Sequence, residues 1–200
     1  MRPPQPRRGD GRRVPPDAEG VPRGAGPHAL SASTRLIVHE VREPAERSRI
    51  CDRILRSLPE WFGIEEAIRE YVRDVQDLPF FEARVERPDA VGFLALKLHT
   101  ARAAEIFVMG VERDVHRRGV GTALVEAAER YLSRLGTEYL QVKTVGPSRP
   151  SPAYEGTRRF YESLDFAPLE EIHELWPGNP CLILVKRVLD TTCNRPRLGA

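Results

Sequence analysis

The sequence predicts a mixed α/β domain of the α+β kind, in which a mostly antiparallel sheet is flanked by about four helices. Short runs rich in β-branched and aromatic residues follow one another closely between residues 80 and 111, as in an antiparallel meander. Segments with apolar residues at helical spacing lie on both sides of these runs. Two further strand-like runs, at residues 166–172 and 181–188, close the pattern.

The elements before the meander are one strand and two helices. The apolar run at residues 36–41 predicts the strand. Residues 45–58 and 64–75 each carry apolar side chains every three or four positions, which predicts two amphipathic helices, and Pro59 separates them.

The meander and the segments after it also show clear strand and helix patterns. Its three strands are predicted at residues 80–85, 90–99 and 103–111. Helical spacing then predicts a helix over residues 119–135, and Gly136 supplies its C-terminal cap. A strand at 138–145, a proline-containing loop and a last helix at 153–164 precede the two closing strands.

Both ends of the chain differ in composition from the middle. Residues 1–34 are rich in Arg, Pro and Gly and cannot bury enough apolar surface to offset their ordering entropy, which predicts a disordered tail. The alternatives are an arm that touches acidic partners and an organelle transit peptide, and the interspersed prolines and acidic residues argue against the second. Residues 35–188 are the predicted domain, and residues 189–200 are a predicted flexible tail.

Charge and cysteine content exclude several classes of protein. The net charge is +2, but the first 35 residues hold seven Arg against three acidic residues and residues 189–200 hold two Arg against one Asp, so residues 36–188 carry −3. A nucleic-acid partner is therefore not expected. The chain has neither an apolar run long enough to span a membrane nor a secretory signal, so we expect a cytoplasmic protein. Its three cysteines are widely spaced and suggest neither a disulfide framework nor a metal site.

The most informative segment runs from Val111 to Leu124, from a strand through a short basic turn into a helix. The first N–H groups of a helix have no internal partners and lie at the positive end of its dipole, so together they bind phosphate. Gly119 and Gly121 have no Cβ atom to keep a pyrophosphate from the backbone. The segment predicts an anion site, with a tight turn whose glycines serve packing as the alternative. Neither the Rossmann fingerprint nor the Gly-Lys-Ser/Thr phosphate loop is present.

Three segments resemble the GNAT superfamily of acyl-CoA-dependent N-acetyltransferases, and the resemblance spans roughly residues 36–188. They are the strand, turn and helix just described, the strand at Ala104–Val111, and the helix at Thr157–Phe166 with its Phe-Tyr pair. At the turn the family usually has Arg or Gln, two variable residues, Gly, one variable residue, and Gly or Ala. His116 takes the Arg/Gln position here, and Asp165 replaces a customary Gly in the third segment.

The resemblance implies a sheet splayed between its fourth and fifth strands, the fifth being residues 138–145, with the pantetheine arm of acetyl-CoA in the split. Tyr154 is included among the implied cofactor-binding residues, although Asn is common at its position in the family. The full set is Val108, Met109, Gly110 and Val111 on the fourth strand, His116, Arg117, Arg118, Gly119, Val120, Gly121 and Thr122 at the helix start, and Tyr154.

The activity that the resemblance implies is direct attack of a primary amine on the acetyl thioester. Glu105, fourteen positions before Gly119, is the candidate general base, and a glutamate on a solvated strand face or paired to an Arg is an equal alternative. Tyr161 is the candidate acid that protonates the coenzyme thiolate, and a core aromatic is its alternative.

The acceptor stays open at this stage: a small amine, an aminoglycoside, an amino acid or a protein N-terminus. The Trp61-Phe62 pair and Trp176 either line the acceptor pocket or serve packing. The rival functions are a non-catalytic CoA-binding regulatory module and an Arg-rich nucleic-acid-binding protein, the second resting only on the tail. The sequence leaves the oligomeric state open.

Overall fold

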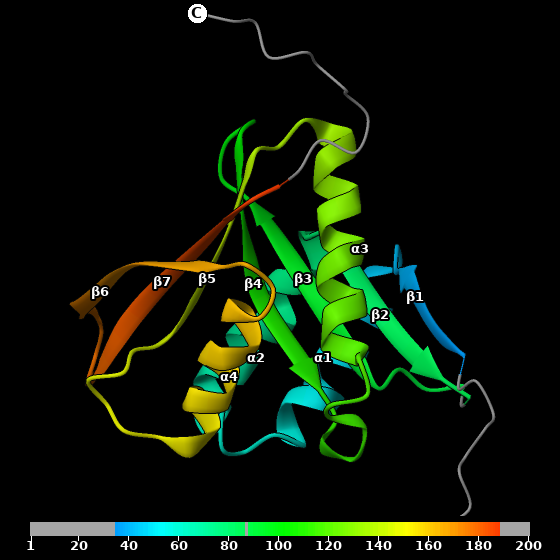
Figure 1. The fold of residues 1–200 in the computed structure, drawn as a ribbon. Helices are drawn as coiled ribbons and strands as arrows, with labels where there is room; N and C mark the ends of the chain where they lie inside the picture. Colours follow the sequence, from blue (N-terminus) through cyan, green and yellow to red (C-terminus); the bar gives the residue numbers. More distant parts are fainter. Residues whose placement is uncertain (1–34, 87, 189–200) are drawn as a thin grey trace, which may run out of the picture. The chain divides into compact units, whose positions relative to one another are not determined.

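A seven-stranded sheet organises the part of the chain that the computed structural model describes, residues 35–86 and 88–188 (Figure 1). The two predicted tails, 1–34 and 189–200, lie outside the described residues. The strands are β1 (Leu36–Glu40), β2 (Phe80–Val85), β3 (Gly92–Leu98), β4 (Ala103–Val111), β5 (Tyr139–Val145), β6 (Ala167–Trp176) and β7 (Asn179–Arg187). Their order across the sheet is β1-β2-β3-β4-β5-β7-β6, and every neighbouring pair is antiparallel except the parallel pair β4–β5.

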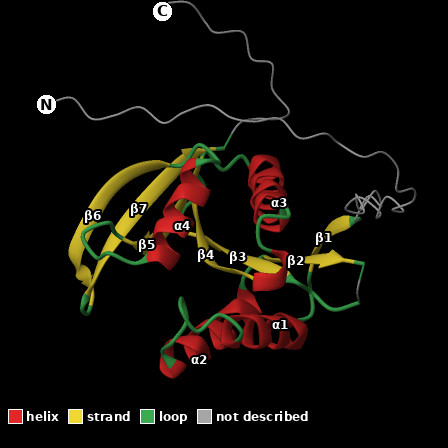
Figure 2. Cartoon of the chain, turned by 60° about the horizontal axis from the view of Figure 1, so that its bottom comes forward, coloured by secondary structure: helices red, strands yellow, loops and turns green. Residues whose placement is uncertain are grey.

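Helices cover both faces of this sheet. Figure 2 shows α1 and α2 on one side of the sheet and α3 on the other. The helices of the described region are α1 (Pro44–Arg56), α2 (Glu65–Asp74), α3 (Val120–Leu135) and α4 (Pro152–Glu162), with short 3₁₀ turns at η1 (Val75–Asp77) and η2 (Arg113–Val115). The predicted mixed, mostly antiparallel fold is confirmed.

Local signals explain where the helices begin and end. Pro44 occupies the first turn of α1, where its missing N–H costs no hydrogen bond. Gly136 ends α3 in the left-handed region at φ 73°, and its N–H donates to the carbonyl groups of Leu132 and Ser133. The predicted C-terminal cap is confirmed. Asp165 adopts the left-handed conformation at φ 65°, so the backbone turn is kept although the customary glycine is missing.

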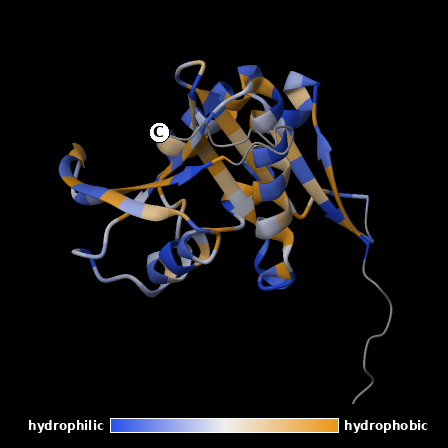
Figure 3. Cartoon of the chain, turned by 45° about the horizontal axis from the view of Figure 1, so that its top comes forward, coloured by the Kyte–Doolittle hydropathy of each residue, from blue (hydrophilic) through white to orange (hydrophobic). Residues whose placement is uncertain are grey.

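Two apolar cores hold the layers together. In Figure 3 the central strands are largely coloured as hydrophobic, while the helices carry both polar and hydrophobic colours. The core beneath α3 and α4 joins their apolar faces to the sheet and includes Leu94, Leu96, Ile106, Leu124, Leu132, Leu140, Leu184 and Tyr161. The core beneath α1 and α2 includes Ile50, Ile54, Leu55, Ile68, Phe80, Phe93 and Val108.

The sheet is split between β4 and β5. Only four residues of each strand pair: Ala103–Ile106 lie beside Tyr139–Val142, and the strands then separate. A β-bulge on β4 lies at the same point, because Leu96 of β3 pairs with Ile106 whereas the preceding Ala95 pairs with Val108, which leaves Phe107 as the extra residue. The splay expected between the fourth and fifth strands is therefore present.

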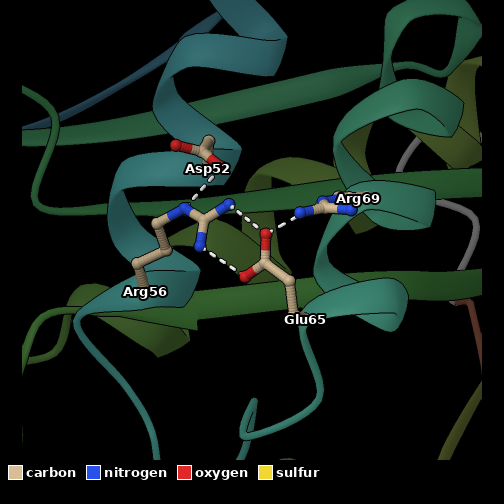
Figure 4. Close-up of polar contacts among 4 residues, drawn as sticks. All are labelled: Asp52, Arg56, Glu65 and Arg69. Carbon is tan, nitrogen blue, oxygen red and sulfur yellow. Dashed lines mark hydrogen bonds and ion pairs between the residues drawn. The ribbon is translucent and has the colours of Figure 1, made fainter.

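Ion pairs between α1 and α2 fix the helix pair that borders this split. Arg56 of α1 donates to both carboxylate oxygens of Glu65 on α2, at 2.6 and 3.0 Å (Figure 4). Asp52 and Arg69 extend the group within their own helices. The hydrogen bonds from Arg56 lower the pKa of Glu65 to about 2. The group is solvent-exposed, so it sets orientation more than stability.

The largest difference from the predicted elements lies at the last hairpin. The strand expected at 166–172 extends as β6 to Trp176, and β7 begins at Asn179. Gly178, at φ 73°, provides the turn between them. Because β6 is an edge strand with mostly exposed side chains, its polar residues do not interrupt it, although they ended the strand in the sequence pattern.

Gly110 on β4 is a point where the packing tolerates no added atom. A Cβ atom there would lie 2.9 Å from Ile54 of α1 and 3.1 Å from the Phe93 ring. We expect Gly110→Ala to lower the free energy of unfolding by about 1–3 kcal/mol, as overpacking usually does. Thermal denaturation should show a fall of several degrees. Gly156→Ala, on α4 with no atom within 4 Å of the added Cβ, is the matched control and should not lower the melting temperature.

Candidate active site

A cleft of about 1410 Å³ opens where β4 and β5 part. Its walls come from β4 and β5 where they separate, the start of α3, α4, α2 with the segment before it, and the tip of the β6–β7 hairpin. Ile106 and Val142, the last paired residues of the two strands, lie at its base. This volume exceeds that of an ordinary small-molecule pocket, so the cleft can hold a ligand as long as a coenzyme together with a second substrate.

The start of α3 forms one end of the cleft and has the geometry of an anion site. Arg117 and Gly119 adopt positive φ angles of 60° and 81°, which turn the chain sharply into the helix. No side chain within the described residues caps the N-terminus of α3. The first N–H groups of the helix are therefore available to an anion beside the cleft. Gly119, Val120, Gly121 and Thr122 all line it.

The two glycines serve different purposes. Gly119 meets a conformational requirement, since its φ of 81° lies in the left-handed region and no atom within 4 Å would meet an added Cβ. At Gly121 an added Cβ would lie 3.0 Å from the Phe160 ring of α4. The packing role considered as the alternative therefore applies to Gly121, because the missing Cβ atom lets α3 and α4 pack closely.

The residues of the basic turn before α3 differ in whether they line the cleft. His116 lines the cleft, and its Nε2 lies 2.8 Å from the carbonyl oxygen of Val111. Because a carbonyl only accepts, Nε2 carries the proton, and the ring braces the turn. Both arginines are exposed, but Arg117 lines the cleft and Arg118 does not. Of the two arginines, Arg117 is the better placed for a phosphate.

The other wall is the edge of β4 beyond the split. Val108, Met109, Gly110 and Val111 line the cleft, as the resemblance implies. They pair with β3 on one side but have no strand partner on the side facing β5 in the described chain. An extended ligand with amide groups can pair with such an edge as an added strand would. Thr144 on β5 also lines the cleft, and its buried hydroxyl oxygen has no hydrogen-bond partner among the described residues.

Tyr161 enters the cleft from α4. Its side chain is 4% exposed and packs edge-on against the rings of Phe160 and Phe166. Burial raises the pKa of the Tyr161 phenol above its ordinary value, so the hydroxyl keeps its proton at neutral pH. The residue thus belongs to the core and lines the cleft at once, and the two roles considered from the sequence are compatible.

Glu105 lies beside the cleft at the centre of a polar cluster. His99, Gln141 and Lys143 donate hydrogen bonds to its carboxylate, at 2.7, 3.1 and 2.8 Å. Burial opposes the ionised form, but these hydrogen bonds outweigh it and lower the pKa of Glu105 below its ordinary value of 4.5. Glu105 is not among the lining residues, whereas Lys143 is. This arrangement favours a buried, ion-paired glutamate, with Lys143 in place of the Arg considered from the sequence, over a base in direct contact with an acceptor.

Replacing Glu105 should change how the stability of the protein depends on pH, because the ion pair with Lys143 is lost. A carboxyl group whose folded pKa is depressed contributes stability above its unfolded pKa, here about 4.5, and that contribution is lost as pH falls through the folded value. We expect Glu105→Gln to lower the free energy of unfolding by about 1–3 kcal/mol at pH 7, since Lys143 loses its partner. The melting temperatures of the parent and of Glu105→Gln should therefore approach each other as the pH is lowered from 7 to 3.5.

A constant difference between Glu105→Gln and the parent over this pH range would contradict the ion-paired interpretation. Glu174→Gln, at an exposed position of β6, is the matched control. It removes a carboxylate without disturbing the cluster around Lys143.

The aromatic residues considered for the acceptor side also reach the cleft. Trp61, Phe62 and Trp176 all line it. The Trp61 indole N–H donates to the Thr157 hydroxyl at 3.1 Å, and the Tyr154 hydroxyl donates to the carbonyl oxygen of Trp61 at 3.0 Å. These contacts tie the segment after α1 to α4 across the cleft, so Tyr154 lines the cleft while its hydroxyl holds that segment.

Lys143 was missed from the sequence, although a signal was present. It is a charged residue inside the strand predicted at residues 138–145, directly after Val142. A cation inside such a strand indicates a buried partner or a ligand.

Among the described residues, no group of three or more His, Cys, Asp or Glu side chains could hold a metal ion. No helix of the described chain is long and apolar enough to cross a membrane.

The family model for the acetyltransferase (GNAT) family matches residues 46–166. The match covers more than half of the chain and includes β4, the α3 turn and α4. The chain therefore belongs to the GNAT acetyltransferase family. No curated protein sequence matched it.

Solved structures share the fold at low sequence identity. A protein described as a GNAT-family acetyltransferase from Desulfovibrio desulfuricans is 18% identical with a TM-score of 0.66, over 78% of this chain and all of that one. An aminoglycoside 6'-N-acetyltransferase complexed with coenzyme A is 18% identical with a TM-score of 0.61, over 80% and 99% of the two chains. NAA60 from Arabidopsis thaliana, in complex with acetyl-CoA, is 16% identical with a TM-score of 0.61, over 77% and 99%.

Proposed function

We propose that this protein transfers an acetyl group from acetyl-CoA to a primary amine by direct attack. The observation that carries the proposal is one continuous cleft that joins an uncapped helix start, an unpaired strand edge and a buried tyrosine. Two of the solved structures with this fold hold coenzyme A or acetyl-CoA, which supports the same ligand here.

The residues present fit acetyl-CoA in both its charged and its extended parts. The helix start from Gly119 to Thr122, with Arg117 beside it, is suited to the diphosphate. The edge of β4 from Val108 to Val111 is suited to the amide-containing pantetheine arm. These two sites meet at the turn that His116 braces, so one ligand can occupy both.

Acetyl-CoA supplies the acetyl group as a thioester, and residues of the protein must assist the two proton transfers. The attacking amine must be neutral, and the departing thiolate must gain a proton. Tyr161 holds a proton at the cleft and is proposed to donate it to the sulfur. Lys143, held by Glu105, places positive charge beside the cleft, which favours the neutral form of an acceptor amine. We propose that the amine proton leaves to water and that Glu105 acts by holding Lys143.

The alternative is a CoA-binding module without turnover, and free thiol release separates the two functions. The full chain is mixed with acetyl-CoA, and primary amines are then added while the thiol is measured. We expect release that depends on the amine and saturates with its concentration. Tight binding of acetyl-CoA by calorimetry, with no amine-dependent release from a broad panel of acceptors, would leave the non-catalytic module as the function.

A further inference from the structure

Three aromatic side chains form one wall of the cleft on the α2 side. Phe62 precedes α2, Tyr71 lies on α2, and Phe107 is the bulge residue of β4. Their rings meet edge to face, with centroids 6.0 Å apart for Phe62 and Tyr71 and 5.4 Å apart for Tyr71 and Phe107. All three line the cleft and are only partly buried. We call these three residues the aromatic wall.

The aromatic wall and the anion site belong to opposite faces of the sheet. α2 and its core lie on one face of the sheet, while α3 lies on the other (Figure 2). The cleft is lined by residues of both β4 and β5. Phe107 marks the point where these strands part. A coenzyme bound at α3 and along β4 would therefore leave the aromatic wall to the acceptor. This step rests on the proposed function.

The charges around the cleft exclude acceptors that carry many positive charges. Among the described lining residues the only carboxylate is Glu60, and it pairs with Arg113 at the α3 end. Lys143 is the charged residue that lines the cleft from β5, and its carboxylate partner Glu105 is not a lining residue. An acceptor with several ammonium groups would lose hydration here without gaining carboxylate partners.

We infer that the acceptor is an amine with a single positive charge and an aromatic or large apolar group that packs on the aromatic wall. Partly exposed rings in a concave site favour a ligand that removes apolar surface from water. The single amine then lies near Lys143 and the split, where β4 and β5 part. An arylalkylamine matches this description, and polyamines and aminoglycosides do not.

A matched set of amines tests the inference with the full chain and acetyl-CoA. 2-Phenylethylamine and ethylamine differ only in the ring, while spermidine and kanamycin carry several positive charges. We expect kcat/KM for 2-phenylethylamine to exceed that for ethylamine by about 30-fold or more, the effect expected for burying one ring. Both polycations should be poorer acceptors than 2-phenylethylamine.

A variant of the aromatic wall, compared by the ratio of its activities toward two amines, distinguishes a lost contact with the ring from a general loss of folding. Phe62→Ala should reduce the ratio of kcat/KM between 2-phenylethylamine and ethylamine by about tenfold, with melting temperature and acetyl-CoA affinity measured in parallel. Leu169→Ala, at an exposed leucine of β6 outside the cleft, should leave the ratio unchanged. A variant that merely loosened the fold would lower both rates together and preserve the ratio.

The outcomes that overturn the inference are distinct from failure of the proposed function. Equal kcat/KM for the two monoamines, faster acetylation of kanamycin or spermidine, or an unchanged ratio in Phe62→Ala would overturn the acceptor class while acetyl transfer stands. Absence of acetylation with all four amines would overturn the acceptor class. If acetyl-CoA also failed to bind in calorimetry, the proposed function would fail with it.

Discussion

We expect Tyr161→Phe to lower kcat by about 100-fold or more while leaving acetyl-CoA affinity nearly unchanged. The ring packs against Phe160 and Phe166, and phenylalanine keeps this packing, so the substitution removes only the hydroxyl. Burial raises the pKa of Tyr161, which keeps the proton available for donation to the thiolate. Steady-state kinetics and calorimetry on the same preparation measure both quantities.

Tyr154→Phe provides the matched control for Tyr161→Phe. Tyr154 lies on the same helix and lines the same cleft, but its hydroxyl donates to the carbonyl oxygen of Trp61 and so holds a loop. Its removal should have a much smaller effect on kcat. An unchanged kcat in Tyr161→Phe, with an acceptor for which chemistry is rate-limiting, would assign Tyr161 to the core alone and leave proton donation to water.

The second large effect is expected at the anion site. Gly121→Glu brings a carboxylate to the helix start, and two negative charges about 5 Å apart repel by about 3 kcal/mol at an effective dielectric constant of about 20. We expect the Kd for acetyl-CoA to rise by about 100-fold or more. Calorimetric titration of acetyl-CoA into the variant and the parent measures this directly.

Two comparisons separate charge from shape in the Gly121 variant. Gly121→Ala adds only a Cβ atom, which would lie 3.0 Å from the Phe160 ring, and so it reports the cost of disturbing the contact between α3 and α4. Ala123→Glu adds the same charge in the first turn of α3 at a position that does not line the cleft. If Gly121→Glu binds acetyl-CoA as tightly as the parent, the diphosphate site lies elsewhere.

Much of the fold follows from local sequence patterns. The bounds of β2 and β4 agree with the predicted strands, and Gly136 caps α3 as its position after the last apolar residue suggests. These features depend on side-chain alternation, helical spacing and backbone freedom within a few residues. The split depends on pairing between distant strands, and only the resemblance to the GNAT superfamily suggested it.

The candidate site is harder to predict from the sequence than the fold, because the contacts that define it join residues far apart in the chain. Glu105 meets Lys143, 38 positions further along, and no local pattern indicates that pairing. The contact between Gly121 and Phe160 and the bulge at Phe107 likewise arise from packing between elements. The sequence thus indicates the chemistry of the α3 turn, whereas the partners that orient each side chain require the structure.

Analysis of the products tests directly whether this protein transfers acetyl groups to primary amines. The full chain is incubated with acetyl-CoA and 2-phenylethylamine, and free coenzyme A and the N-acetylated amine are quantified together by mass spectrometry. We expect equal amounts of the two products, both strongly reduced in Tyr161→Phe and, at subsaturating acetyl-CoA, in Gly121→Glu. Coenzyme A released without any acetylated amine, across this and other primary amines, would contradict an N-acetyltransferase.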